Sequence, residues 1–127
     1  KRLKVMSELH IKSRLAGVFP ALTATQIIAK LVHLQNWRLS GGDEGGANLA
    51  IERKFEFANY FETIAFVNAV AFVVHQLDHH PELTFTYNSC VVRLNTHDVK
   101  GISQLDFDCA TQIEALIKSD AIAKDAV

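Results

Sequence analysis

Hydrophobic and polar residues recur with two different periods along this chain, and each period indicates a class of secondary structure. Residues 49–57 alternate well, which predicts a half-buried antiparallel strand. Shorter alternating runs at 37–39, 83–87 and 90–96 predict three more strands, with a turn at Asn88-Ser89 between the last two. The apolar face of the strand at 49–57 also carries Arg53, and its members are Leu49, Ile51, Phe55 and Phe57.

Three other stretches have the spacing of amphipathic helices, and each follows a capping signal. The signal is an N-cap residue with an acidic or amide side chain three positions later, at Thr23 and Gln26, Asn59 and Glu62, and Ser103 and Asp106. The second helix is apolar around much of its circumference, which is typical of burial in a core or at a subunit interface. Pro81 disfavours helical backbone at the preceding residue, so this helix should end near Asp78 or His79.

The order of these elements, α-β-β-α-β-β-α, predicts the fold class. Two hairpins and three helices indicate an α+β domain, with a four-stranded antiparallel sheet and three helices packed on one face. We assign residues 20–127 to this single domain and residues 1–19 to an N-terminal extension. The glycine-rich stretch SGGDEGGAN is expected to be a hairpin loop, because no Lys-Ser or Lys-Thr pair follows it as in a phosphate-binding loop.

Composition excludes several classes of protein. The chain has 127 residues, of which 49% are hydrophobic and 21% charged, so it can bury a core. A net charge of −1 predicts no bulk attraction to nucleic acid or anionic membranes. The longest apolar run, at 60–74, is too short for a membrane span and contains Glu62 and Asn68. Cys90 and Cys109 form no CxxC pair, so we expect reduced thiols in a soluble cytoplasmic protein.

Histidines concentrate in one segment, since four of the six lie between residues 75 and 97. Three interpretations compete. The rings perform general acid/base chemistry, because their unperturbed pKa lies near neutrality; or His75, His79 and His97 bind Zn²⁺; or the rings are structural or exposed. The metal interpretation lacks a HExxH-type pattern. The spacing alone leaves all three open.

Four short motifs resemble one protein family. LDHHPE, the Tyr87-Asn88 pair, LNTHD and GISQLD occur in the order and spacing found in pterin-4a-carbinolamine dehydratases, over about residues 20–118. The resemblance implies a dehydratase that eliminates water from 4a-hydroxytetrahydropterin, the 4a-carbinolamine, to give quinonoid dihydropterin in tetrahydrobiopterin recycling. It also implies histidine general acid/base catalysis without a metal or an organic cofactor.

The resemblance also implies roles for individual residues. The family's catalytic histidines fall on His79, His80 and His97, and its supporting carboxylate falls on Asp106, which also suits the N3 capping position. We favour His79 and His97 as the proton-transfer pair. The substrate-binding positions implied are Asp78, Pro81, Asn95 and Thr96. Two positions depart from the family pattern: His75, where an acidic residue is often found, and Leu83, where an aromatic residue is common.

The resemblance finally implies partners. The family forms homodimers or homotetramers, and the apolar second helix and the two sheet edges agree with such assembly. Some members bind a homeodomain transcription factor as a dimerisation cofactor, and an aromatic amino acid hydroxylase is a second protein partner that the family implies. A non-catalytic binding module on the same fold is therefore the alternative function, and it would use helix surfaces without needing the histidines.

Overall fold

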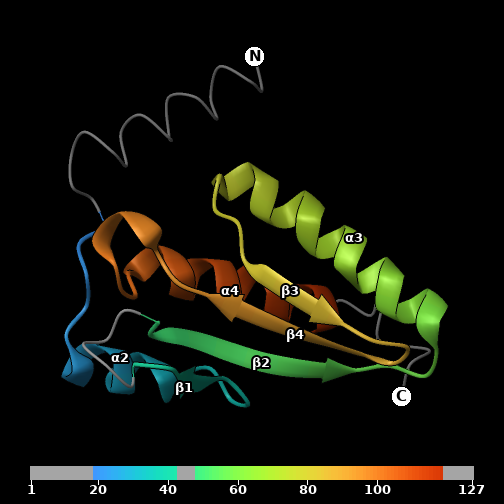
Figure 1. Ribbon diagram of the computed structural model, residues 1–127, viewed down its shortest axis with the longest axis horizontal. Coiled ribbons are helices and arrows are strands. Elements are labelled where there is room, and N and C mark those ends of the chain that lie inside the picture. The colour runs from blue at the N-terminus through green and yellow to red at the C-terminus, as the bar shows by residue number, and fades with distance from the viewer. Residues whose placement is uncertain (1–18, 43–47, 119–127) are drawn as a thin grey trace.

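The computed structural model describes residues 19–42 and 48–118, and these form an α+β domain (Figure 1). The predicted order is confirmed, with one additional turn of 3₁₀ helix, η1, before the last helix. The predictions for residues 1–18, 43–47 and 119–127 lie outside the described residues. The elements are α2 (Ala24–Leu31), β1 (Arg38–Ser40), β2 (Ala50–Glu56), α3 (Tyr60–Leu77), β3 (Glu82–Phe85), β4 (Ser89–Leu94), η1 (His97–Val99) and α4 (Gln104–Lys118).

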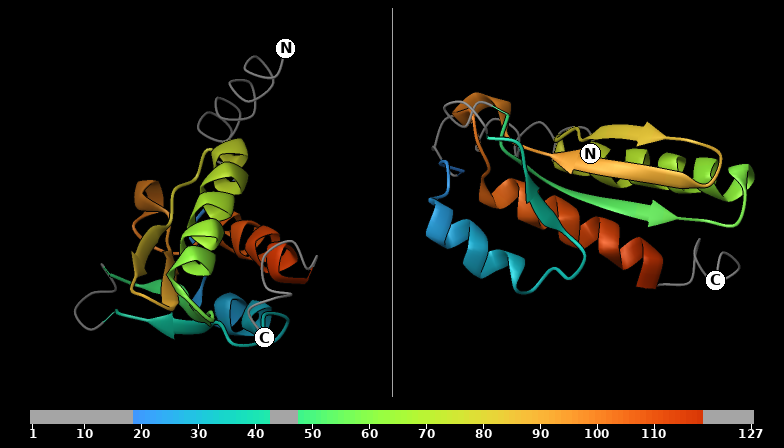
Figure 2. Two further views of the ribbon diagram at one scale, coloured as in Figure 1. Left: turned by 90° about the vertical axis from the view of Figure 1, so that its right-hand side faces the viewer. Right: turned by 60° about the horizontal axis from the view of Figure 1, so that its bottom comes forward.

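The four strands form one antiparallel sheet in the spatial order β1-β2-β4-β3. At its centre, β2 pairs with β4 so that Ile51 lies opposite Leu94 and Phe55 lies opposite Cys90. All four side chains are buried. Because side chains alternate across a strand, this register gives the sheet one apolar face. The three helices cover that face (Figure 2).

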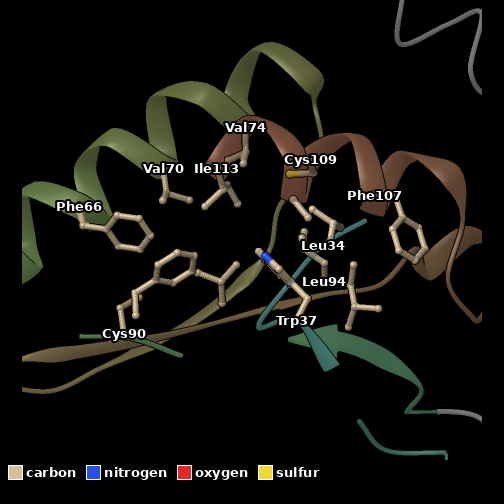
Figure 3. Packing of buried hydrophobic residues seen from close by; sticks show 14 of the residues in the cluster. Leu34, Trp37, Phe66, Val70, Val74, Cys90, Leu94, Phe107, Cys109 and Ile113 are labelled. Carbon is tan, nitrogen blue, oxygen red and sulfur yellow. The ribbon is translucent and has the colours of Figure 1, made fainter. Parts of the chain in front are cut away.

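The core lies between the sheet and the helices α3 and α4 (Figure 3). Phe66 of α3 is fully buried, and its ring centroid lies 4.6 Å from that of Phe55 and 5.1 Å from that of Phe57. From α4, Cys109 and Ile113 are also fully buried. Cys109 is therefore a small core residue.

The predicted capping residues begin the helices as expected. Thr23 and Gln26 form a complete capping box, and the Asn59 side chain accepts from the backbone N–H of Glu62. One prediction is wrong by a residue. The turn between β3 and β4 has Tyr87 and Asn88 at its tip, because the Thr86 N–H donates to the Ser89 carbonyl at 2.9 Å and the two hydroxyls lie 2.8 Å apart.

Helix α3 (Tyr60–Leu77) extends beyond the apolar run at 60–74. Among the described helices it is the one long and apolar enough to cross a membrane, with a mean hydropathy of 1.3. Buried helices of compact domains have the same length and composition, and α3 places Thr63, Phe66, Val70 and Val74 in the core. Its remaining surface is largely uncovered in the described chain, where Phe61 is 81% exposed.

Candidate active site

A carboxylate in the first turn of α4 is the centre of the candidate site. The Asp106 side chain is fully buried, and each of its oxygens has a partner. Oδ2 accepts from the backbone N–H of Ser103 at 3.0 Å and from the Thr96 hydroxyl at 2.7 Å. Oδ1 lies 2.5 Å from Nε2 of His79. Since a buried charge is tolerated only when it is paired and hydrogen-bonded, these contacts explain how Asp106 can be buried.

The end of α3 places His79 at this carboxylate. Asp78 takes up left-handed backbone with φ 51°, which turns the chain away from the helix axis. The N–H of His79 still donates to the Val74 carbonyl at 3.3 Å, and its side chain is only 11% exposed. Pro81 cannot continue the helix, so the chain leaves α3 here and enters β3. The helix end predicted at Asp78 or His79 is confirmed to within one residue.

The segment after β4 places Thr96 on the other side of Asp106. Thr96 and Gly101 form an isolated antiparallel bridge, in which the Thr96 N–H donates to the Gly101 carbonyl at 2.7 Å. This bridge closes η1 into a tight loop, with Lys100 in left-handed backbone at φ 53°. Figure 1 shows the end of α3, the end of β4, η1 and the start of α4 toward the same end of the molecule.

The structure therefore joins three of the predicted site residues directly, namely His79, Thr96 and Asp106. The other two histidines follow them in the chain: His80 comes after His79, His97 comes after Thr96, and both are exposed. The Asn95 amide donates to the Leu49 carbonyl at 3.4 Å. His75 is exposed on α3, one turn before His79.

Ser103 also belongs to this site, although the sequence predicts it only as a helix N-cap. Its side chain does accept from the Leu105 N–H at 3.2 Å. The same hydroxyl also lies 2.7 Å from the Thr96 hydroxyl, and Ser103 is fully buried. An N-cap serine followed by an aspartate three positions later was the available signal, but it revealed a cap and not the contact with Thr96.

No three His, Cys, Asp or Glu side chains are grouped so that they could hold one metal ion in the part of the chain that the structure describes. The two cysteines do not supply a nucleophile. Both are buried, and burial raises the pKa of Cys90 to about 11 and that of Cys109 to about 12. Thiols with such pKa values are protonated at neutral pH and react poorly. The chemistry available at this site is therefore that of imidazole, carboxylate and hydroxyl groups.

A family model described as pterin 4 alpha carbinolamine dehydratase matches residues 20–116. The chain belongs to this family. A relative from Paracidovorax citrulli is 57% identical over 97 residues, which cover 76% of this chain and 81% of the relative. A relative from Bdellovibrio bacteriovorus is 51% identical over 100 residues, covering 76% and 78%. Both bear the name "Putative pterin-4-alpha-carbinolamine dehydratase", which supports this activity for the family.

Two solved structures have the same fold. One is described as a transcriptional coactivator/pterin dehydratase from Brucella melitensis; it has a TM-score of 0.68 and 32% identity, and the match covers 76% of this chain and 97% of that one. The other is a pterin dehydratase-like protein described as a RuBisCO assembly factor in the alpha-carboxysome, with a TM-score of 0.53, 22% identity and coverages of 66% and 92%. At that identity the second structure shows the fold alone.

Proposed function

We propose that this protein is a 4a-hydroxytetrahydropterin dehydratase that acts in tetrahydrobiopterin recycling by histidine general acid/base catalysis. The observation that carries the proposal is the contact between His79, the first histidine of the HHP motif, and the buried carboxylate of Asp106. Such a pairing orients an imidazole and stabilises its protonated form, as a general acid/base requires. The family match and the names of the relatives support the substrate class.

The reaction needs two proton transfers. The C4a–O bond breaks, and an acid protonates the departing oxygen so that it leaves as water. A base takes the proton from N5, and the N5–H electron pair forms the C4a=N5 bond of the quinonoid product. An imidazolium and a neutral imidazole can share these tasks near pH 7, because the unperturbed pKa of histidine is about 6.5. No electron acceptor is required, and we propose that the enzyme uses neither a metal nor an organic cofactor.

We assign the two transfers to His79 and His97. His80 then binds the substrate or acts on the other face of the ring. Asp78, Pro81 and Asn95 stay predicted substrate contacts, and they belong to the two segments that flank the histidines. We propose a reduced cytoplasmic location, in which the buried Cys90 and Cys109 stay as thiols.

Alanine variants test this assignment. His79→Ala and His97→Ala should each lower turnover of 4a-hydroxytetrahydropterin by at least about tenfold, after subtraction of spontaneous dehydration. His33→Ala is the matched control, because His33 is an exposed histidine outside the motif. Activity should persist after treatment with a chelator. Folded His79 and His97 variants that match the parent in rate would contradict the proposal and favour a non-catalytic binding module.

One observation favours protein binding as a second function. Helix α3 exposes three large aromatic side chains, with Tyr60 49%, Phe61 81% and Phe72 64% exposed. Exposed apolar patches of this kind mark interaction surfaces. The Brucella melitensis relative is described as both a coactivator and a dehydratase, which supports a transcription factor as one candidate partner and leaves the hydroxylase as the other. Binding should then survive His79→Ala and be lost in Phe61→Glu.

We propose that the same surface is used in self-assembly, as a homodimer or homotetramer. A sheet edge is a second surface available for assembly. Strand β3 pairs with β4 on one side, and its other edge is unpaired in the described chain. Phe85 at its end is 40% exposed. Light scattering at micromolar concentration should show an oligomer that Phe61→Glu weakens and that Ile28→Glu, at an exposed position of α2, does not. A parent protein that is only monomeric would contradict this proposal.

A further inference from the structure

The hydroxyl groups of Thr96 and Ser103 form a chain of hydrogen bonds that ends at Asp106. Thr96 Oγ1 lies 2.7 Å from Asp106 Oδ2 and 2.7 Å from Ser103 Oγ, and Ser103 Oγ accepts from the Leu105 N–H. Each hydroxyl has one hydrogen to donate. Both residues are buried, Ser103 fully and Thr96 with 8% exposed, so water does not compete freely for these bonds.

The direction of this chain follows from the group at its end. Asp106 Oδ2 already accepts the Ser103 backbone N–H, which can only donate. The carboxylate is therefore an acceptor at Oδ2, and the hydrogen of the Thr96 hydroxyl points to it. Thr96 has no second hydrogen, so Ser103 donates to Thr96. The resulting order of donors is Leu105 N–H, Ser103 O–H, Thr96 O–H and then Asp106.

The contacts of Asp106 also determine which ring nitrogen of His79 carries a hydrogen. Oδ2 accepts two donors, and an ionised carboxylate, which is acceptor-only, offers Oδ1 as a further acceptor. The 2.5 Å contact at Oδ1 therefore requires a hydrogen on Nε2 of His79. Nδ1 of His79 has no hydrogen bond within the described residues. The buried side-chain nitrogens and oxygens without a partner there comprise Arg53 Nε alone, so Nδ1 of His79 is not buried and reaches the surface.

We propose that Thr96 and Ser103 are positioning residues which, through Asp106, hold His79 in its Nε2–H tautomer and make Nδ1 the atom that exchanges protons with the substrate. The claim that Nδ1 exchanges protons with the substrate rests on the proposed function, whereas the assignment of the tautomer does not. In the neutral ring Nδ1 accepts the proton, and the resulting imidazolium keeps its Nε2–H on Asp106. Thr96 thereby positions Asp106 and does not contact the substrate as the sequence suggested, because its hydroxyl is bonded to Ser103 and Asp106.

Nitrogen-15 NMR of the histidine rings tests the tautomer directly, without any turnover. In the parent protein at a pH where His79 is neutral, its Nε2 should carry the hydrogen. Asp106→Asn should reverse this. The Ser103 N–H and the Thr96 hydroxyl require the amide oxygen on their side, so the NH₂ group faces His79 and donates to Nε2, which moves the ring hydrogen to Nδ1. A parent His79 with its hydrogen on Nδ1, or an Asp106→Asn protein with an unchanged tautomer, would overturn the proposal.

Kinetics test the positioning role. Thr96→Val should lower kcat by about tenfold with KM nearly unchanged, since misplacement of a catalytic group acts on the chemical step. Thr96→Ser keeps the hydroxyl and should restore kcat to within about twofold of the parent. Thr63→Val is the matched control, because Thr63 is also fully buried and its hydroxyl lies 3.0 Å from the carbonyls of Asn59 and Tyr87, outside the site.

The outcomes separate this inference from the proposed function. A Thr96→Val protein with raised KM and normal kcat would return Thr96 to a substrate contact and overturn the positioning role. An equal loss of kcat in Thr63→Val would overturn it as well, since it would reflect general destabilisation. If His79→Ala is fully active while the parent ring has its hydrogen on Nε2, the proposed function fails and the tautomer assignment stands. If Asp106→Asn does not fold, the parent spectrum and the Thr96 variants still decide.

Discussion

Glu114 of α4 ties the helix layer to the sheet, and its removal should be among the more damaging single changes outside the site. Its Oε2 accepts from the Trp37 indole N–H at 2.7 Å and also contacts the Arg53 guanidinium of β2. The Arg53 and Glu114 side chains are 18% and 14% exposed. The Arg53 guanidinium carbon also lies 4.3 Å from the centre of the Phe55 ring, so the cation is held between the carboxylate and an aromatic face.

The expected loss for Glu114→Ala follows from these contacts. Breaking a buried ion pair by removal of one partner costs about 3–5 kcal/mol, because the remaining charge stays buried without compensation. Since both side chains keep some contact with water, we expect a decrease of about 2–4 kcal/mol in the free energy of unfolding. Arg53 Nε is already without a hydrogen-bond partner in the described residues, so the guanidinium has little means of replacing the lost acceptor. The melting temperature should fall by about 10 °C.

Urea unfolding followed by far-UV circular dichroism, at one fixed protein concentration, measures this loss. Glu56→Ala is the control, because the Lys54–Glu56 pair is long at 3.7 Å and both side chains are mostly exposed. It should change stability by less than about 0.5 kcal/mol. The double variant Arg53→Met/Glu114→Leu should recover most of the loss, since it leaves no buried charge. A Glu114→Ala protein as stable as Glu56→Ala would refute this reasoning.

Other properties follow from burial and charge. The raised pKa values of Cys90 and Cys109 predict slow reaction with a thiol reagent at pH 8 in the native protein and fast reaction in urea. Because the unfolded thiols ionise near pH 8.5, stability should fall as the pH rises from there through about 11 and 12. The Arg38 hydrogen bond lowers the pKa of Glu52. This pair should therefore stabilise the fold at neutral pH by less than about 1 kcal/mol, and the stabilisation should be lost as the pH falls through the lowered pKa. Phe66→Ala should lower the free energy of unfolding by about 3–5 kcal/mol, measured by urea titration, because it empties a fully buried position.

The fold could be predicted because its signals are local. Period-two alternation at 49–57 and the capping pairs at Thr23, Asn59 and Ser103 each depend on residues within a few positions of one another. The position of the turn between β3 and β4 could not be predicted to the residue, since Asn88-Ser89 lacks the glycine that would fix a tight turn. The structure resolves it by the bonds between Thr86 and Ser89.

The sequence could name candidate site residues but not the contacts between them. The motifs identify His79 and Asp106, yet they are 27 positions apart, and no local pattern shows that they touch. The same limit hid the bond from Trp37 to Glu114, 77 positions away, and the link between the Thr96 and Ser103 hydroxyls, which depends on the bridge from Thr96 to Gly101. These contacts arise from packing between elements, which residue spacing does not encode.

The residues that start α4 and stop α3 also form the candidate site. Asp106 satisfies the Ser103 N–H as the N3 residue of a capping box, and the same carboxylate holds His79. The positive end of the α4 dipole favours a negative charge at this position, where the Asp106 carboxylate lies fully buried. At the other side, the left-handed Asp78 and the following Pro81 stop α3 so that His79 turns toward α4. A substitution of Asp106 should therefore affect helix stability and catalysis together, and the tautomer of His79 is the quantity that separates the two effects.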